Sequence, residues 1–219
     1  MAVELTSSPS LVDQFRRDIV GGVYNPRERL VEVELAERYG VTRSAMRAAL
    51  LELTAEGLVE REPNRGARIR ALTVAEGIEI AEVRRELESL CARLAAERAT
   101  DDERARLREI IDDMHTAFAD LDMHRYLAAN STLHMTILEM ARHQVARRIL
   151  TQLGNLNFNR HFPMAFTAPV PSASMAEHER VAEAIIRGDA DAAETAMYDH
   201  LSSLIEVLRA QASAPANGG

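Results

Sequence analysis

The sequence predicts a mainly α-helical protein, with a small winged helix-turn-helix followed by an all-helical bundle. Two observations lead to this fold class. Residues 10–72 have the pattern of three short helices and then a hairpin, which is the element order of a winged helix-turn-helix. Residues 73–210 have the pattern of about six longer amphipathic helices and no strand, as in a helical bundle. Residues 1–9 and 211–219 are predicted to be flexible tails.

The first region is predicted to contain helices and strands at 11–20, 31–39, 42–56, 58–62 and 67–70. Gly40 is suited to end the second helix, and Thr42 to cap the start of the third. The two helices are then joined by a tight turn. Apolar residues are expected to pack them together: Leu35, Val41, Met46, Leu50 and Leu53.

The second region is predicted to contain helices at 73–99, 100–119, 122–141, 143–162, 174–187 and 189–210. Thr73 and Thr100 stand where N-caps are expected. The first of these helices has four apolar residues on one stripe: Val83, Leu87, Leu90 and Leu94.

Composition excludes several classes of protein. The 219 residues are 47% hydrophobic, enough to form a core. Cys91 is the single cysteine, which rules out an intrachain disulfide and a cysteine-based zinc finger. No apolar run approaches the ~20 residues of a membrane span, and residues 1–10 lack the pattern of a signal peptide. We therefore expect a cytoplasmic protein without membrane association.

The net charge of −8 is unevenly distributed along the chain. Residues 1–72 contain 11 arginines and 11 acidic residues, whereas residues 73–219 contain 15 arginines and 23 acidic residues. The whole negative excess therefore belongs to the second region. Because binding to nucleic acid depends on a local basic face, the acidic total does not exclude it.

The start of the predicted helix 42–56 has the side chains of a DNA-reading helix. Arg43 and Arg47 are four residues apart on one face, and arginine can bind guanine through two parallel hydrogen bonds. A solvated helix that binds nothing is the alternative for this helix alone, but the following hairpin favours DNA. The candidate DNA-binding residues, with those at the tip of the wing, are Thr42, Arg43, Ser44, Arg47, Asn64, Arg65 and Gly66.

Residues 19–70 resemble the DNA-binding domain of the GntR family of bacterial transcription regulators. The matching motifs are Asn25-Pro26-Arg27, Arg29-Leu30, Leu35-Ala36, Gly40-Val41, Thr42 to Leu50, Gly57-Leu58 and Asn64-Arg65-Gly66. The sequence departs from the family pattern at Arg27, where the turn has Gly, at Ala45, where it has Pro, and at Ala48, where it has Glu. None of these departures removes an expected DNA contact.

The resemblance continues into the second region. Residues 82–88, Glu-Val-Arg-Arg-Glu-Leu-Glu, followed by Leu94-Ala95-Ala96, are similar to the opening of the FCD effector domain found in the FadR subfamily. The resemblance implies a helical domain that binds a small effector. Arg84 is a candidate for the effector's carboxylate, with a salt bridge to a neighbouring glutamate as the alternative, and Asn159 is a weaker candidate.

Three histidines stand on the core-facing stripes of three different predicted helices: His134, His178 and His200. One buried histidine is usually a core residue, but three together suggest that they share a divalent metal such as zinc or nickel. Asn130 precedes His134 by one helical turn. The resemblance implies the same ligand set, because metal-binding FCD domains use Asp-x3-His and two later histidines, with Asn130 here in place of Asp.

The asparagine changes the expected charge of this site. Its neutral carbonyl oxygen leaves the charge of the ion uncompensated, so we expect weaker metal retention and stronger coupling to an anionic effector. The predicted function is a homodimeric transcriptional repressor on a palindromic double-stranded DNA operator, controlled by a small carboxylate at the metal. Two alternatives are a regulator that responds to the metal alone and a metal-dependent hydrolase, which lacks a convincing general base.

Overall fold

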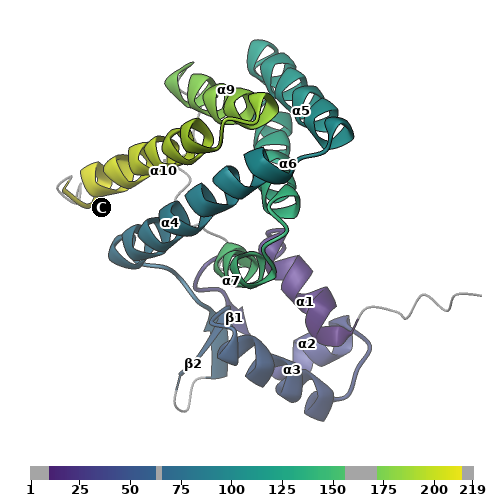
Figure 1. The fold of residues 1–219 in the computed structure, drawn as a ribbon. Coiled ribbons are helices and arrows are strands. Elements are labelled where there is room, and N and C mark those ends of the chain that lie inside the picture. Colours follow the sequence, from purple (N-terminus) through teal and green to yellow (C-terminus); the bar gives the residue numbers. More distant parts are fainter. Residues whose placement is uncertain (1–9, 63–65, 156–171, 214–219) are drawn as a thin grey trace, which may run out of the picture. The chain divides into compact units, whose positions relative to one another are not determined.

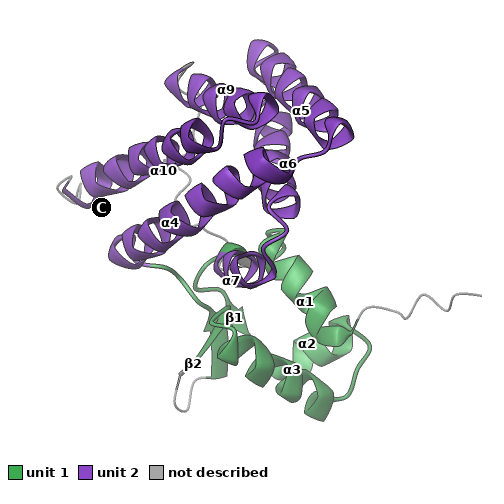
Figure 2. Cartoon of the chain, viewed as in Figure 1, with its two compact units in different colours: residues 1–72, 154–161 green, residues 73–153, 162–219 purple. Residues whose placement is uncertain are grey.

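The computed structural model describes residues 10–62, 66–155 and 172–213. The chain divides into two compact units, the first made of residues 1–72 with 154–161 and the second of residues 73–153 with 162–219 (Figure 2). Within the described residues, no helix combines the length and the apolar character needed to cross a membrane.

The first unit is a winged helix-turn-helix. Its helices are α1 (Leu11–Val20), α2 (Glu32–Arg38) and α3 (Arg43–Ala55), and its strands are β1 (Arg29–Leu30), β2 (Val59–Glu62) and β3 (Gly66–Ile69). The sheet is antiparallel in the order β1-β3-β2. The sequence analysis missed β1, because two residues are too few to show an alternating pattern.

A small apolar core holds this unit together. The residues expected between α2 and α3 are buried, apart from Val41, which is half-buried against the same core. Gly40 ends α2 with a positive φ of 64°, a conformation that glycine adopts without a steric penalty. The amide of Val41 then donates to the carbonyl of Ala36, which closes the turn. The first part of α3 is thereby fixed relative to α2.

The second unit contains the six expected helices in its described residues (Figure 1). They are α4 (Val74–Arg98), α5 (Asp101–Ala119), α6 (Met123–Met140), α7 (Gln144–Asn155), α9 (Ser172–Arg187) and α10 (Ala190–Ser213). Thr73 and Thr100 form capping boxes with Glu76 and Glu103, so both predicted caps are confirmed. Helix α10 packs along α4 and against α9.

The apolar stripe predicted on α4 is only partly buried, with Leu87 and Leu90 packed at the edge of a core cluster. Val83 is exposed and Leu87 and Leu90 are half-buried, so only Leu94 of that stripe is buried. The buried face consists instead of small residues and one acid: Ala81, Glu88, Ser89, Cys91, Ala92, Ala95 and Ala96. Small side chains let neighbouring helices approach α4 closely, and this packing outweighs the larger apolar area of the leucines.

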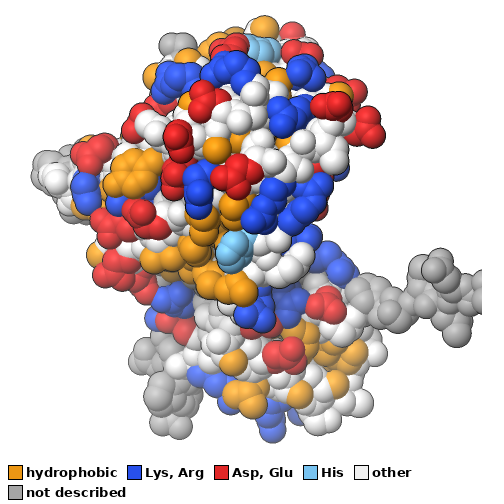
Figure 3. Space-filling view, viewed as in Figure 1, with side chains coloured by type: hydrophobic (Ala, Val, Ile, Leu, Met, Phe, Trp, Pro, Cys, Tyr) orange, Lys and Arg blue, Asp and Glu red, His pale blue; other side chains and the backbone are white. Residues whose placement is uncertain are grey.

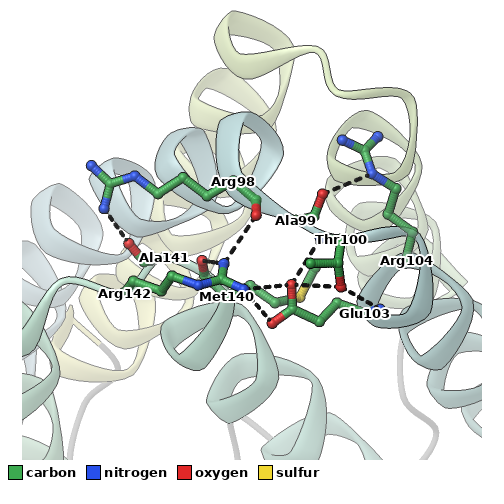
Figure 4. Close-up of polar contacts among 8 residues, drawn as sticks. All are labelled: Arg98, Ala99, Thr100, Glu103, Arg104, Met140, Ala141 and Arg142. Carbon is green, nitrogen blue, oxygen red and sulfur yellow. Dashed lines mark hydrogen bonds and ion pairs between the residues drawn. The ribbon is translucent and has the colours of Figure 1, made fainter.

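Arginines near the helix ends join neighbouring helices of the second unit. Arg98, at the end of α4, donates to the carbonyl of Ala141 after α6 at 2.7 Å, and Arg142 donates back to the carbonyl of Arg98 at 3.0 Å (Figure 4). Arg104 donates to the carbonyl of Ile186 near the end of α9 at 2.6 Å. Cations are favourable at these carbonyl-rich ends. These contacts join α4 to the end of α6, and α5 to the end of α9.

Candidate DNA-reading element and metal centre

The start of α3 exposes all four of its predicted DNA-binding residues: Thr42, Arg43, Ser44 and Arg47. The hydroxyl of Thr42 accepts a hydrogen bond from the amide of Ala45 at 3.2 Å, so Thr42 is the predicted N-cap. Met46 and Leu50 are buried on the opposite face of the helix. The helix therefore presents its first turns outward, as a groove-reading helix requires.

Arg47 is held by an acidic residue that the sequence analysis did not single out. Its Nη2 and Nε donate to Oε2 of Glu32, at the start of α2, at 2.7 and 3.0 Å. The hydrogen bond from Arg47 lowers the pKa of Glu32. Arg61 of β2 lies 3.8 Å from the other oxygen of the same carboxylate. Glu32 thus fixes the direction of an otherwise exposed arginine.

The wing is described only in part. Gly66 begins β3 with a positive φ of 92°, whereas Asn64 and Arg65 lie outside the described residues. On the face drawn in Figure 3, acidic and basic side chains of the described residues are intermixed over each unit. The negative excess of the sequence is therefore not gathered into one patch on that face.

The three predicted histidines lie together in the second unit. His134 is on α6, His178 on α9 and His200 on α10, and one side-chain nitrogen of each lies within 4.8 Å of the others. The ring centres of His178 and His200 are 4.3 Å apart. Helices from three separate parts of the sequence thus bring three imidazoles to one point.

Each imidazole is oriented by a hydrogen bond through Nδ1. That of His134 donates to Glu88 at 2.7 Å, that of His200 to Glu177 at 3.1 Å, and that of His178 to the carbonyl of Ser174 at 2.7 Å. Carboxylate and carbonyl oxygens accept hydrogen bonds, so Nδ1 carries the proton in all three rings. Each Nε2 therefore keeps its lone pair, as metal-ligating histidines require.

Two unsatisfied atoms fit a metal at this cluster. His178 is 3% exposed, and its Nε2 is buried without a hydrogen-bond partner among the described residues. Asn130, one turn before His134 on α6, is 9% exposed, and within the same part of the chain its buried Oδ1 has no partner either. Leaving such groups unpaired is costly. An imidazole nitrogen and an amide oxygen are both suitable metal ligands.

The protonation of the cluster is also compatible with metal binding. Burial, followed by the neighbouring His200 and His134, lowers the pKa of His178 well below its usual value. Burial lowers the pKa of His200 as well, and it outweighs the hydrogen bond that His200 donates to Glu177, which raises that pKa. Both rings are therefore neutral at pH 7, the form that binds metal ions.

The sequence analysis missed both carboxylates that orient the histidines. Glu88 is 3% exposed on the small-residue face of α4, and Glu177 immediately precedes His178 on α9 but bonds to His200. Burial raises the pKa of Glu88, but its interactions with Arg84 and with His134 together outweigh burial and lower that pKa. A glutamate spaced among alanines on one helix face was the signal that could have identified Glu88.

Of the two predicted effector contacts, Arg84 and Asn159, the structure describes Arg84. Arg84 donates through Nε to Glu88 at 2.7 Å, which is the salt bridge that the sequence analysis weighed as the alternative. Arg84, Glu88 and His134 thus form a continuous chain of hydrogen bonds. Asn159 lies outside the described residues.

Comparisons with known proteins agree with both units. Residues 8–69 match the gntR family of bacterial regulatory proteins, and residues 79–203 match the FCD domain. The chain belongs to the GntR family of transcriptional regulators. Its FCD domain is the helical unit that contains the histidine cluster. The chain is thus a DNA-binding regulator and not an enzyme, since its domains and its relatives are those of regulators.

Curated relatives match most of the chain, and a solved structure shares its fold. The transcriptional repressor RspR of Escherichia coli is 26% identical over 89% of this chain and 85% of its own length. A probable D-xylose utilization operon repressor of Paenarthrobacter nicotinovorans is 28% identical over 86% of this chain and 80% of its own. The E. coli McbR/YncC structure, at 20% identity, covers 92% of this chain and 96% of its own with a TM-score of 0.75, so it shares the fold.

Proposed function

We propose that this GntR-family regulator is a repressor whose operator affinity depends on a divalent metal and a small organic acid bound in the FCD domain. The observation that carries the proposal is the histidine cluster, in which each Nδ1 is occupied and each Nε2 keeps its lone pair. The names of RspR and of the D-xylose operon relative support repression.

Three histidines and one asparagine would hold the metal: Asn130, His134, His178 and His200. Zinc and nickel both suit imidazole ligands. The ion would supply positive charge and open coordination positions for an anionic effector. Arg84 and Asn159 are the proposed contacts for the rest of that acid.

Coupling between effector and DNA follows from linkage. An acid that binds one arrangement of the regulator more tightly than another shifts the population toward that arrangement. The acid then changes operator affinity by the same factor by which operator binding changes the affinity for the acid. Thr42, Arg43, Ser44 and Arg47 would contact the operator, together with Asn64, Arg65 and Gly66 of the wing. The charged groups of α3 would supply both base and phosphate contacts.

We infer that the regulator acts as a homodimer, because a palindromic operator is matched by a two-fold symmetric protein. An exposed apolar surface supports this inference. Val83 of α4 and Val145 and Ile149 of α7 are exposed, beside the half-buried Leu87 and Leu90. Figure 3 shows hydrophobic side chains gathered over this part of the FCD domain. Pairing of two copies would remove that surface from water.

Operator titration tests the proposal. Duplexes selected from a random pool by the full chain are titrated by fluorescence anisotropy with a chelator, with zinc, and with zinc plus acetate, glycolate or succinate. We expect affinity to differ by about 5- to 150-fold between chelator and zinc with one of the acids, and the difference to vanish in His178→Ala. Equal affinity in every condition would contradict the proposal, and a response to zinc alone would favour a metal sensor.

A further inference from the structure

We propose that Glu88 and Glu177 supply, from behind the histidines, the negative charge that Asn130 does not supply as a ligand. The inference rests on the metal centre proposed above. It assigns the charge balance of the centre to two residues that do not belong to the ligand set.

The hydrogen bonds carry this inference. Each glutamate accepts from the Nδ1 of a different histidine, on the side of the ring away from Nε2. A carboxylate in that position raises the basicity of the imidazole and compensates the charge of an ion bound through it. The third histidine donates to a neutral carbonyl, so the two glutamates are the charged partners of the cluster among the described residues.

Burial argues against an ordinary ion pair at Glu88. Its side chain is 3% exposed in a face made otherwise of small residues, where a buried carboxylate is expensive and often adds nothing to stability. Glu177 is also largely buried, and it accepts a second hydrogen bond from Ser203 at 2.8 Å. Both carboxylates are thus fixed in place.

The count of charges points to the class of effector. Among the described residues, the largely buried charged groups hydrogen-bonded around the histidines are two carboxylates, Glu88 and Glu177, and one guanidinium, Arg84. Arg180, whose charge also acts on Glu177, is exposed to solvent and is not counted with them. A dication bound there leaves one formal positive charge among these groups. One carboxylate group of an organic acid would cancel it. Metal and a single carboxylate are therefore expected to bind together, with the acid tighter in the presence of the metal.

Zinc affinity measured by competition with a chromophoric chelator tests the proposal on the full chain. Glu88→Gln and Glu177→Gln keep an oxygen that can accept from Nδ1 but remove the charge. We expect each to weaken zinc binding by about 10- to 100-fold. Glu179→Gln is the matched control, because Glu179 is a half-exposed residue of α9 that pairs with His115. Unchanged zinc affinity in both Gln variants would overturn the proposal.

A charge-rescue variant separates electrostatics from structure. Asn130→Asp in the Glu177→Gln background returns a negative charge to the ligand set, and we expect it to restore most of the lost zinc affinity. A double variant no tighter than Glu177→Gln would overturn the proposal. Circular dichroism in the presence of a chelator shows whether each variant is folded. If Glu88→Gln does not fold, the comparison of Glu177→Gln with its rescue variant still tests the proposal.

The same titration distinguishes failure of this inference from failure of the metal centre. Zinc binding by the wild type that is lost in His178→Ala would support the centre, whatever the Gln variants do. If the wild type and His178→Ala bind equally little zinc, the centre itself is wrong, and this inference fails with it.

Discussion

Asn130 is the residue at which this chain departs from the expected ligand set, and its buried Oδ1 has no hydrogen-bond partner in the part of the chain that the structure describes. We expect Asn130→Asp to tighten zinc binding about tenfold, because a carboxylate adds charge to the ligand set. This gain in zinc affinity is expected to be smaller than the gain from the same substitution in the Glu177→Gln variant, where the site has lost a further negative charge. Competition titration measures both. Zinc affinity equal to that of the wild type would contradict this expectation.

Arg27 occupies a backbone conformation that suits glycine. Its φ is 66°, and it stands where the family's turn has glycine. We expect Arg27→Gly to raise the free energy of unfolding by about 0.5–1 kcal/mol, because glycine adopts this conformation without a steric penalty. Denaturant unfolding measures the change, with Arg27→Ala as the control that removes the guanidinium and keeps the strain. Equal stability of the two variants would refute this explanation.

At the scale of elements, the ion pair between Glu32 and Arg47 joins α2 to the exposed face of α3. We expect Glu32→Gln to strengthen binding to random duplex and to reduce the preference for the operator. The reason is that a negative charge is lost and Arg47 is no longer directed. Anisotropy with both duplexes at several salt concentrations measures this preference. Glu34→Gln, an equal charge change at an exposed position of α2, is the control, and the same response in both variants would contradict the role of Glu32.

The elements themselves could be predicted largely from local chemistry. Caps such as Thr42, Thr73 and Thr100 fix where helices begin, because a side-chain oxygen there satisfies a free backbone amide. The buried face of α4 could not be predicted in this way. Its burial is decided by which helices pack on it, and hydrophobicity alone favoured the leucines.

The candidate site shows the same division between local and tertiary information. Three histidines on apolar stripes were sufficient to predict that they meet. Glu88 and Glu177 were missed because a glutamate on a helix is normally solvated, and only the tertiary structure places each beside a histidine. The pairing of Arg47 with Glu32 is likewise a contact between separate helices.

At the scale of the whole molecule, the exposed apolar surface of α4 and α7 is expected to join two copies. We expect the double variant Val145→Glu and Ile149→Glu to be monomeric, because burying two carboxylates without partners is unfavourable. Size-exclusion chromatography with light scattering measures the mass. Leu121→Glu, at an exposed leucine between α5 and α6, is the control and should remain dimeric. A dimeric double variant would exclude this surface as the interface.

The central claim is that the histidine cluster holds a metal together with an organic acid. Native mass spectrometry of the full chain, purified without chelator, tests it most directly. We expect a dimer with one metal ion per chain and a small additional acidic mass, both lost in His178→Ala. A wild-type dimer that carries neither mass, even after incubation with zinc and with nickel, would contradict the claim and leave the three histidines as core residues of a DNA-binding regulator.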